Sequence, residues 1–433
     1  MNIEAALAHA IQHHEAGRLR DAEALYRQVL EAKPDHADAL YLLGILAHEA
    51  GDQQQALALI TQAIEQDGEN THYHNGLGNV LRALQRPEES LTAYRRAVEL
   101  EPNAVAAQCN IGAVLQQLGE LDEAVSNYER VIRLEPRYGD AHYNLGIALK
   151  DQGKLDEAIA ALKRAIELDP QHAHAYVVVG GYLLEQGNAR AALSAFDECL
   201  SRNPRHVHAM AFKSIALNEL DQGGVARKLV DFERLIKKVR IDPPTGFSTV
   251  DEFNTALADH IRTHPTMIKQ PSSGATRFGM HTDELLVETE GVFRAFKTIV
   301  NQAITDYLQR LPADSAHPYL AHRPSRWRLS TWGVVLNQQG HQIPHIHPSG
   351  WVSGVYYVKL PESFKANTKT REGWIEFGQP PPEYHGDADV ETKTVQPEEG
   401  LMLLFPSYFY HRTIPLESIG ERISFAFDTL PEF

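Results

Sequence analysis

The sequence predicts a multidomain protein in which an all-α solenoid of helical hairpins is followed by a domain of short β-strands with flanking helices. Three observations lead to this fold class. Glycines and prolines recur every 34 residues through the first half of the 433-residue chain. The hydrophobic pattern changes from helical spacing to short apolar or alternating runs in the second half. A helix-breaking segment, Asp-Pro-Pro-Thr-Gly at 242–246, separates the two patterns.

Several residue types share the 34-residue period in the first half. One glycine series, placed where two helices of a hairpin approach closely, is Gly44, Gly78, Gly112, Gly146 and Gly180. A second series, at the predicted end of each first helix, is Gly17, Gly51, Gly119, Gly153 and Gly187, with Gln85 in the remaining place. Prolines that would end each second helix are Pro34, Pro102, Pro136, Pro170 and Pro204. This recurrence predicts stacked helical hairpins.

These positions resemble the tetratricopeptide repeat (TPR), whose period is 34 residues. The clearest units are Ala-His-Tyr-Asn-Leu-Gly at 141–146 and the turn Gly-Lys-Leu-Asp-Glu-Ala at 153–158. The resemblance covers about residues 3–206, and residues 207–240 continue with helical spacing and a Lys/Arg-rich run. We therefore predict a first domain over residues 1–240, a TPR solenoid of about six repeats plus a degenerate capping repeat.

Solenoids of this type present a concave groove, lined by the first helix of each hairpin, that usually binds a peptide or protein segment. Asparagine recurs in the groove at Asn110 and Asn144, where its amide could bond a peptide backbone. The alternative is that these side chains make contacts between helices or are simply solvated. The candidates are Tyr73, His74, Asn110, Tyr143, Asn144 and Tyr176. A protein or peptide is accordingly the predicted partner.

The second half is predicted to fold as a double-stranded β-helix (jelly roll) with helices at its N-terminal side, over residues 247–433. Helical spacing indicates helices at 250–262 and 291–310. Short apolar or alternating runs separated by proline and glycine then indicate strands. The predicted strands lie at 327–337, 350–360, 374–377, 392–395, 400–405 and 422–427.

Composition excludes several classes of function. The net charge of −16 offers no basic stripe for nucleic acid. No window is long and apolar enough to predict a membrane span, and we expect no signal peptide at the start of the chain. The two cysteines, Cys109 and Cys199, fall at apolar positions of predicted helices and favour buried thiols in a reducing compartment. We therefore expect a cytoplasmic protein, and the oligomeric state is open.

A histidine pattern in the last fifth of the chain points to a metal site. His345 and His347 are two residues apart on a strand-like segment, so that their side chains point the same way. A third imidazole, His411, would close one face of the site from a distant strand. Eleven residues further on, Arg422 offers a fixed, always-charged fork for a carboxylate, and Ser424 shares its face of the strand.

The surrounding segments resemble the Fe(II)- and 2-oxoglutarate-dependent dioxygenases, in particular an uncharacterised bacterial and phage subset. The resemblance rests on the stretches 345–358, 400–412 and 421–427 and covers about residues 325–428. It implies Fe(II) as the metal, with His345 and His411 as ligands, and 2-oxoglutarate as cosubstrate. It further implies that Arg422 and Ser424 bind the C5 carboxylate of 2-oxoglutarate. Either Tyr356 or Tyr357 would add a hydroxyl, and the spacing does not distinguish the two.

His347 departs from the pattern of that family, which usually has Asp or Glu at this position. Three interpretations compete. His347 completes a set of three imidazole ligands, which is our prediction because its position points inward. Alternatively His347 stands aside and leaves two histidines and water, or the barrel is inactive. His341, four residues before His345, is a weaker candidate with a role in a loop or behind the ligands.

The resulting hypothesis is an Fe(II)- and 2-oxoglutarate-dependent hydroxylase whose TPR groove recruits a protein or peptide substrate. One alternative is a TPR binding scaffold with an inactive barrel. Another is a cupin-like metalloenzyme with three histidine ligands that does not use 2-oxoglutarate. The role implied for Arg422 favours the first hypothesis. Neither the substrate nor the hydroxylated residue follows from the sequence.

Overall fold

The computed structural model describes residues 2–269, 275–285, 291–362, 364, 370–384, 388, 390–417 and 420–432. The chain forms two compact units, residues 1–170 and 171–433. This division falls inside the repeat array and does not test the predicted domain boundary between 240 and 247, which stays a prediction. In the described part of the chain, no helix is long and apolar enough to cross a membrane.

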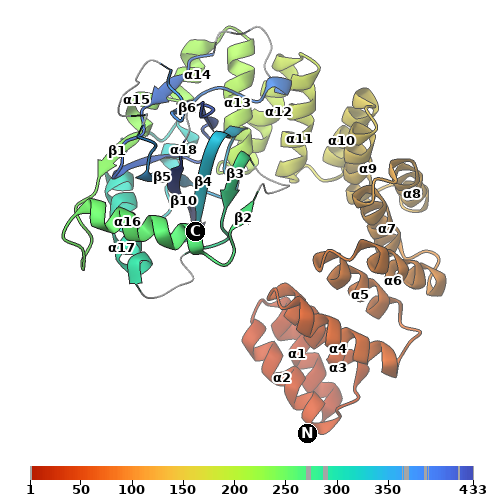
Figure 1. Ribbon diagram of the computed structural model, residues 1–433. Helices are drawn as coiled ribbons and strands as arrows, with labels where there is room; N and C mark the ends of the chain where they lie inside the picture. The colour runs from red at the N-terminus through yellow and green to blue at the C-terminus, as the bar shows by residue number, and fades with distance from the viewer. Residues whose placement is uncertain are drawn as a thin grey trace. The chain divides into compact units, whose positions relative to one another are not determined.

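The first unit consists of antiparallel helical hairpins in sequence order (Figure 1). Helix pairs repeat with the period that the glycines predict. The helices are α1 (Ile3–Glu15), α2 (Leu19–Ala32), α3 (Ala37–Glu49), α4 (Gln53–Gln66), α5 (Thr71–Ala83), α6 (Pro87–Leu100), α7 (Val105–Gln117), α8 (Leu121–Leu134), α9 (Gly139–Asp151) and α10 (Leu155–Leu168).

The turn after each first helix adopts the left-handed backbone that the glycine series predicts. Gly17, Gly51, Gly119 and Gly153 have φ between 71° and 86°. Gln85, which occupies the remaining place, has φ 58° and so accepts the same conformation without being glycine. The turn geometry of the repeat therefore persists at a residue for which it is less favourable.

The second unit begins with helices that continue the repeat pattern. They are α11 (Ala173–Glu185), α12 (Ala189–Arg202), α13 (Val207–Glu219), α14 (Gly223–Leu229) and α15 (Phe232–Leu235). These helices contact the β-domain directly: the Phe212 and Tyr384 ring centroids are 5.0 Å apart. The Tyr307 hydroxyl donates to the carbonyl of Leu235 at 2.8 Å. Such buried contacts explain why these helices group with the barrel.

The prediction that the helical cap continues to residue 240 is wrong. Lys237–Arg240 form a strand, β1, that pairs antiparallel with β8 (Leu401–Pro406). Its exposed lysines and arginine lie on an edge strand, where charges discourage pairing with other chains. A charged run of four residues has no clear period, so tertiary pairing decides between helix and strand.

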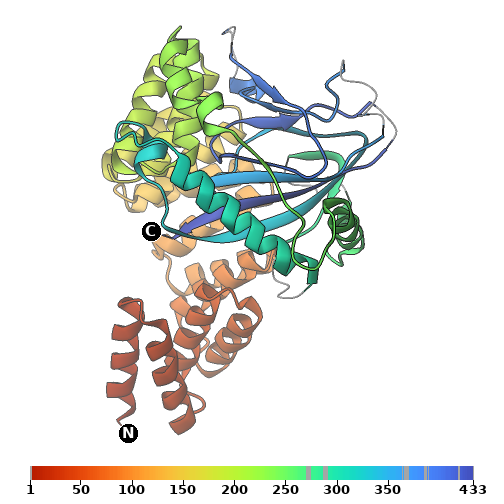
Figure 2. The ribbon, with the colours of Figure 1, turned by 90° about the vertical axis from the view of Figure 1, so that its left-hand side faces the viewer.

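The β-domain is a curled antiparallel sheet with the order β1-β8-β5-β10-β4-β9-β6-β7, and β3 joins it through β4. This arrangement confirms the predicted jelly-roll architecture (Figures 1 and 2). The helices predicted at 250–262 and 291–310 are confirmed as α16 and α17. The remaining elements are α16 (Val250–Thr263), β2 (Ile268–Lys269), β3 (Thr276–His281), α17 (Gly291–Arg310), α18 (Pro318–Ala321), β4 (Arg326–His345), β5 (Val352–Lys359), β6 (Ile375–Phe377), a 3-10 turn at Pro382–Tyr384, β7 (Lys393–Val395), β9 (His411–Thr413) and β10 (Arg422–Glu432).

The long strand β4 connects the two layers of the domain. Its first part, 326–336, pairs with β10, and its last part pairs with β9 through His345 and His411. Between these parts, Gln339 has φ 67° and the register of β4 against β3 shifts between Leu336 and His341. β4 thus has β10 as its neighbour along its first part and β9 along its last.

The two faces of the central strands have different surroundings. Phe425 packs edge-to-face on Phe296 of α17, with ring centroids 4.9 Å apart. A Cβ added to Gly333, the β4 partner of Phe425, would meet Ile261 of α16 at 2.6 Å. This face is therefore covered by helices α16 and α17. Because side chains alternate along a strand, the even-numbered residues 422–428 of β10 face the barrel interior.

The close helix contact at Gly180 gives a testable prediction with a matched control. A Cβ at Gly180 would lie closer than 3.0 Å to three atoms of the Phe196 ring, whereas one at Gly181 would meet Phe212 at 3.6 Å, an ordinary contact. Gly180→Ala is expected to lower the free energy of unfolding by about 1–3 kcal/mol through overpacking. Gly181→Ala is expected to raise it by up to about 1 kcal/mol, because alanine favours helix. Urea denaturation measures both, and an equal loss in the two variants would contradict the prediction.

Candidate metal centre

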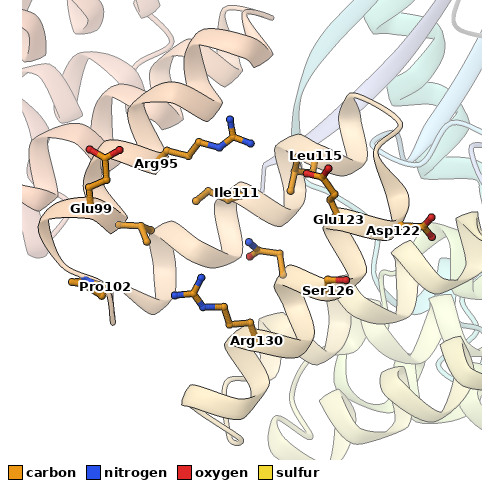
Figure 3. A pocket seen from close by; sticks show the side chains of 11 residues that line it. Arg95, Glu99, Pro102, Ile111, Leu115, Asp122, Glu123, Ser126 and Arg130 are labelled. Carbon is orange, nitrogen blue, oxygen red and sulfur yellow. The ribbon is translucent and has the colours of Figure 1, made fainter.

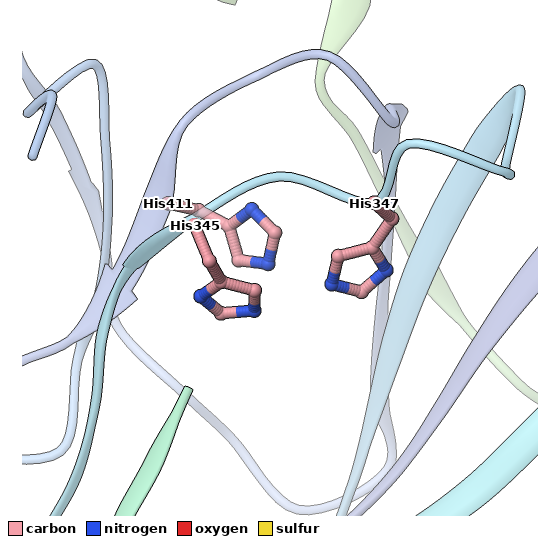
Figure 4. A group of neighbouring side chains, drawn as sticks. All are labelled: His345, His347 and His411. Carbon is pink, nitrogen blue, oxygen red and sulfur yellow. The ribbon is translucent and has the colours of Figure 1, made fainter. Parts of the chain in front are cut away.

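Three histidines lie together inside the barrel (Figure 4). Two of them come from the strands β4 and β9, and the third comes from the segment between β4 and β5. His345 ends β4 and His411 begins β9, and the two are direct antiparallel partners, so their side chains point the same way. His347 lies just beyond β4, where its backbone N–H donates to the carbonyl of Ser407 at 3.0 Å. Ring centroids in the group are 4.2–5.1 Å apart.

The hydrogen bonds of the three rings determine which nitrogen faces the centre of the group. The Nδ1 atoms of His345 and His411 lie 2.8 and 3.0 Å from the carbonyls of Ile343 and Phe409. Nδ1 of His347 lies 2.6 Å from a carboxylate oxygen of Asp428. Because these partners only accept, each Nδ1 carries a proton, and in the neutral ring this leaves the lone pair on Nε2. One ligand atom from each ring lies within 4.8 Å of the others.

Burial favours the neutral, metal-binding form of these imidazoles. Desolvation, followed by the nearby His347, lowers the pKa of His345 to about 3. Desolvation also lowers the pKa of His411 well below its ordinary value, and His411 is 5% exposed. Both rings are consequently uncharged at neutral pH. Imidazole nitrogens gathered from three histidines are a donor set that fits a divalent transition metal.

Asp428 completes the surroundings of His347, and sequence reasoning missed it. It lies on β10 and also accepts a hydrogen bond from the Ser353 hydroxyl at 2.6 Å. Its position six residues after Arg422 repeats the alternation that links Arg422 to Ser424. The sequence could have indicated Asp428, because an even number of residues separates it from Arg422 and the two therefore share a face of the strand. Nothing in the sequence, however, indicates that β10 contacts His347.

Arg422 lies on the same interior face and is 2% exposed. Its Nη1 is 3.4 Å from the Ser424 hydroxyl, and its guanidinium carbon is 5.1 Å from the centre of the Tyr357 ring. Nε has no hydrogen-bond partner, and no carboxylate of the described residues pairs with the guanidinium. Burial lowers the pKa of Arg422. A buried guanidinium with unused donors fits an anionic ligand such as the carboxylate of 2-oxoglutarate.

The structure distinguishes the two candidate tyrosines. Tyr357 pairs with Ser424 in the register of β5 and β10, and its buried hydroxyl lacks a hydrogen bond of normal geometry among the described residues. Tyr356 points to the opposite face, where its hydroxyl donates to Asn254 of α16 at 2.7 Å. Tyr356 is thus placed away from Arg422, and Tyr357 beside it.

An open cleft of about 370 Å³ reaches the histidine group. Its lining includes His345 and His347, and the Trp332 ring centroid is 5.4 Å from that of His347. Asp283, Glu284 and Ser330 also line it. This cleft therefore opens onto the candidate metal position. His341 is absent from the group, and its Nδ1 lies near the carbonyl of Gln339 at 2.9 Å.

A larger hollow of about 740 Å³ lies in the first unit, where α6, α7 and α8 meet (Figure 3). Arg95 and Arg130 carry their guanidinium groups at its edge, and Ile111 and Leu115 supply apolar surface. It contains no histidine or cysteine. Throughout the described ranges, His345, His347 and His411 form the one group of three or more potential ligands for a metal ion.

The proposed groove residues of the repeats divide into two sets. Tyr73 and His74 are buried, and they bond within the array to Asp38 and to the carbonyl of Gly68. Tyr176 is likewise buried. The remaining candidates are half-buried: Asn110, Tyr143 and Asn144. For Tyr73, His74 and Tyr176 the structure therefore agrees with the alternative interpretation, in which these side chains make contacts within the helical array.

The fold and the site together define a helical-repeat protein joined to a jelly-roll domain with a three-histidine centre. Residues 330–428 match the protein family described as "Putative 2OG-Fe(II) oxygenase". Residues 13–80, 78–119 and 109–173 match tetratricopeptide-repeat families. The chain therefore belongs to the tetratricopeptide-repeat proteins through its first half and carries a domain of that oxygenase family in its second.

Three solved structures that are similar to parts of this chain are those of YrrB, TTC0263 and MamA. YrrB, a TPR protein with an unusual peptide-binding site, is 30% identical, with 39% of this chain and 88% of YrrB covered and a TM-score of 0.34. The thermophilic TPR protein TTC0263 of Thermus thermophilus is 23% identical over 42% of this chain and 99% of that chain, with a TM-score of 0.38. MamA of Desulfovibrio magneticus RS-1 is 21% identical over 39% and 96%, with a TM-score of 0.36. No curated protein matches the chain.

Proposed function

We propose that the protein is an Fe(II)- and 2-oxoglutarate-dependent oxygenase that hydroxylates a protein or peptide substrate recruited by its TPR groove. The observation that carries this proposal is the interior face of β10. Arg422 and Ser424 lie at one end of this face, and Asp428, bonded to His347, lies towards the other. The donor group for an organic acid and the carboxylate that bonds His347 therefore lie on the same face of one strand.

Under this proposal each group has one task. His345, His347 and His411 would hold Fe(II) through Nε2. Arg422 would bind the C5 carboxylate of 2-oxoglutarate, assisted by the hydroxyls of Ser424 and Tyr357. When bound, the metal and 2-oxoglutarate would activate O2, with one oxygen atom entering the substrate as a hydroxyl group and the other entering succinate as CO2 is released. The walls around Arg422 exclude water, because the guanidinium and the Tyr357 hydroxyl are both buried.

Support for a peptide substrate comes from the repeats. Asn110 is half-buried and donates to Asn75 at 3.2 Å, which leaves the Asn110 carbonyl oxygen for another partner in the described structure. Asn144 follows at the next repeat. Side-chain amides in a row can bond the backbone of an extended peptide irrespective of its side chains. YrrB, whose repeats resemble these, has a peptide-binding site, and we extend that property to this chain as part of the proposal.

A second candidate function is a three-histidine metalloenzyme that does not use 2-oxoglutarate. The neutral ligand set favours it, because the usual carboxylate ligand is missing. Arg422 disfavours it, since a buried guanidinium without a carboxylate would then have no ligand to bind.

An anaerobic titration separates the two. The metal-free protein is expected to bind one Fe(II) per chain and to develop a weak visible charge-transfer band when 2-oxoglutarate is added. On exposure to O2, succinate should form slowly, and faster with peptides that occupy the groove. Iron binding without a band and without succinate would contradict the proposal and support the second candidate.

A further inference from the structure

We infer that Asp428 is a positioning residue that orients His347 as the third metal ligand and supplies the negative charge that the three-imidazole set lacks. This inference rests on the metal site of the proposed function but not on 2-oxoglutarate. It assigns a role to the carboxylate that neither the family match nor the histidine pattern indicates.

His347 differs from the other two imidazoles in how its ring is held. His345 and His411 each bond the main-chain carbonyl two residues earlier, at Ile343 and Phe409. Those bonds form within one local segment. The ring of His347 is instead held by a side chain 81 residues away, through Nδ1 at 2.6 Å from Asp428. Without Asp428, therefore, His347 would keep its backbone position but lose the contact that directs its Nε2 to the group.

Hydrogen bonds and close packing hold the Asp428 carboxylate in position. The Ser353 hydroxyl donates to it at 2.6 Å and lies 2.8 Å from the Ser407 hydroxyl, and both serines are fully buried. A Cβ added to Gly350 would lie 3.2 Å from Cγ of Asp428 and 2.7 Å from the Ser407 oxygen. Close packing of this kind leaves the carboxylate one orientation.

Among the described residues, His347 is the one ion-pair partner of the Asp428 carboxylate. The side chains of His347 and Asp428 are each 12% exposed, and no lysine or arginine of the described residues pairs with this carboxylate. A buried carboxylate is costly unless a positive charge lies beside it. A divalent metal on Nε2 of His347 would provide that charge through the ring. This carboxylate–histidine–metal relation fixes the ring and makes the imidazole a stronger donor.

This arrangement explains how position 347 can be histidine, where the oxygenase family usually has Asp or Glu. Two imidazoles and one carboxylate would place one negative charge in direct contact with the metal. Here three imidazoles contact it and the single negative charge lies one ring further out. The formal charge around the metal is the same, so a divalent ion is neutralised to the same extent.

The test measures metal affinity of the metal-free protein by Co(II) titration, using the visible d–d absorption, so that no turnover is needed. Asp428→Asn is expected to weaken Co(II) binding by about 10- to 100-fold, the usual range for outer partners of metal-binding histidines. Asp428→Glu, which keeps the charge, should recover part of this loss. Ser353→Ala is the matched control, because it removes a hydrogen bond to the same carboxylate but leaves the bond to His347, and it should change affinity less than about threefold. Thermal unfolding of each metal-free variant shows whether the fold persists.

A double-mutant cycle distinguishes positioning from a merely structural role. In a His347→Asp background the ligand is itself a carboxylate, so Asp428 has no imidazole to orient and would repel it. Adding Asp428→Asn there should leave affinity unchanged or raise it. If Asp428→Asn binds Co(II) as tightly as the unmodified protein, or weakens binding equally in both backgrounds, the inference about Asp428 is overturned while the metal site stands. If the unmodified protein binds no metal, the proposed function fails as well.

Discussion

Arg422→Ala is expected to weaken 2-oxoglutarate binding by about 100-fold while the metal site remains. The guanidinium is buried and has unused donors, so a carboxylate bound there would accept charge-assisted hydrogen bonds with little competition from water. Losing two such bonds costs about 3 kcal/mol, or about 100-fold in affinity. Anaerobic titration of the Fe(II) protein with 2-oxoglutarate measures the dissociation constant, and Fe(II) affinity should stay within about threefold.

Arg422→Met adds a measurement that separates a ligand-binding arginine from a structural one. Because the described residues offer Arg422 no carboxylate, its burial is a cost that a bound acid would offset. The methionine variant should therefore be more stable than the unmodified protein when 2-oxoglutarate is absent, by up to about 2 kcal/mol. Arg262→Met is the control, since Arg262 pairs with Glu421 and Asp259 at the outer helix α16. That control should lose stability and keep its affinity for 2-oxoglutarate, and a destabilised Arg422→Met protein would contradict the assignment.

Replacing both His345 and His411 with alanine is expected to eliminate specific Fe(II) binding. These two rings are antiparallel strand partners, and their Nδ1 bonds hold both Nε2 atoms toward one point. The remaining imidazole would be a single ligand, so affinity should fall by more than about 1000-fold, given 10- to 100-fold effects even for outer partners. Equilibrium dialysis with metal analysis gives the stoichiometry, which should drop from one to none.

His341→Ala is the matched control for that loss. His341 lies on the same strand but outside the group, with its ring beside Phe278 at 6.3 Å between centroids. Its replacement should leave one Fe(II) per chain. Metal binding that survives the double replacement, or that disappears with His341, would show that the site has been assigned to the wrong residues.

Much of the fold follows from local patterns. The 34-residue recurrence of glycine predicts the helical hairpins, and Gly180 lies against Phe196 as the pattern requires. The helices at 250–262 and 291–310 and six strands are also predicted close to their observed positions, including the three-residue strands β6 and β7, which proline and glycine clusters set apart. The strands that were not predicted are β1, β2, β3 and β9, whose residues show no clear alternation of apolar and polar side chains.

The candidate site was likewise predictable from the sequence only in part. His345, His347, His411 and Arg422 are recognisable from residue type and spacing, and the structure brings the three imidazoles together. The choice between Tyr356 and Tyr357 depends on which face of β5 turns inward. Two neighbouring residues on a strand point to opposite faces, and the sequence alone does not show which face is the interior. Here helix α16 covers one face of β5, where the Tyr356 hydroxyl donates to Asn254.

The chemical groups of the site are thus determined by the chain itself, because three imidazoles and a guanidinium at this spacing are typical of a metal centre beside an acid-binding position. What the chain order leaves open is the pairing between strands that are far apart in sequence. The antiparallel register of β4, β9 and β10 determines that Asp428 meets His347 and that Arg422 stays buried without a carboxylate. Contacts of this kind depend on packing across some eighty residues of intervening chain, and no local preference encodes them.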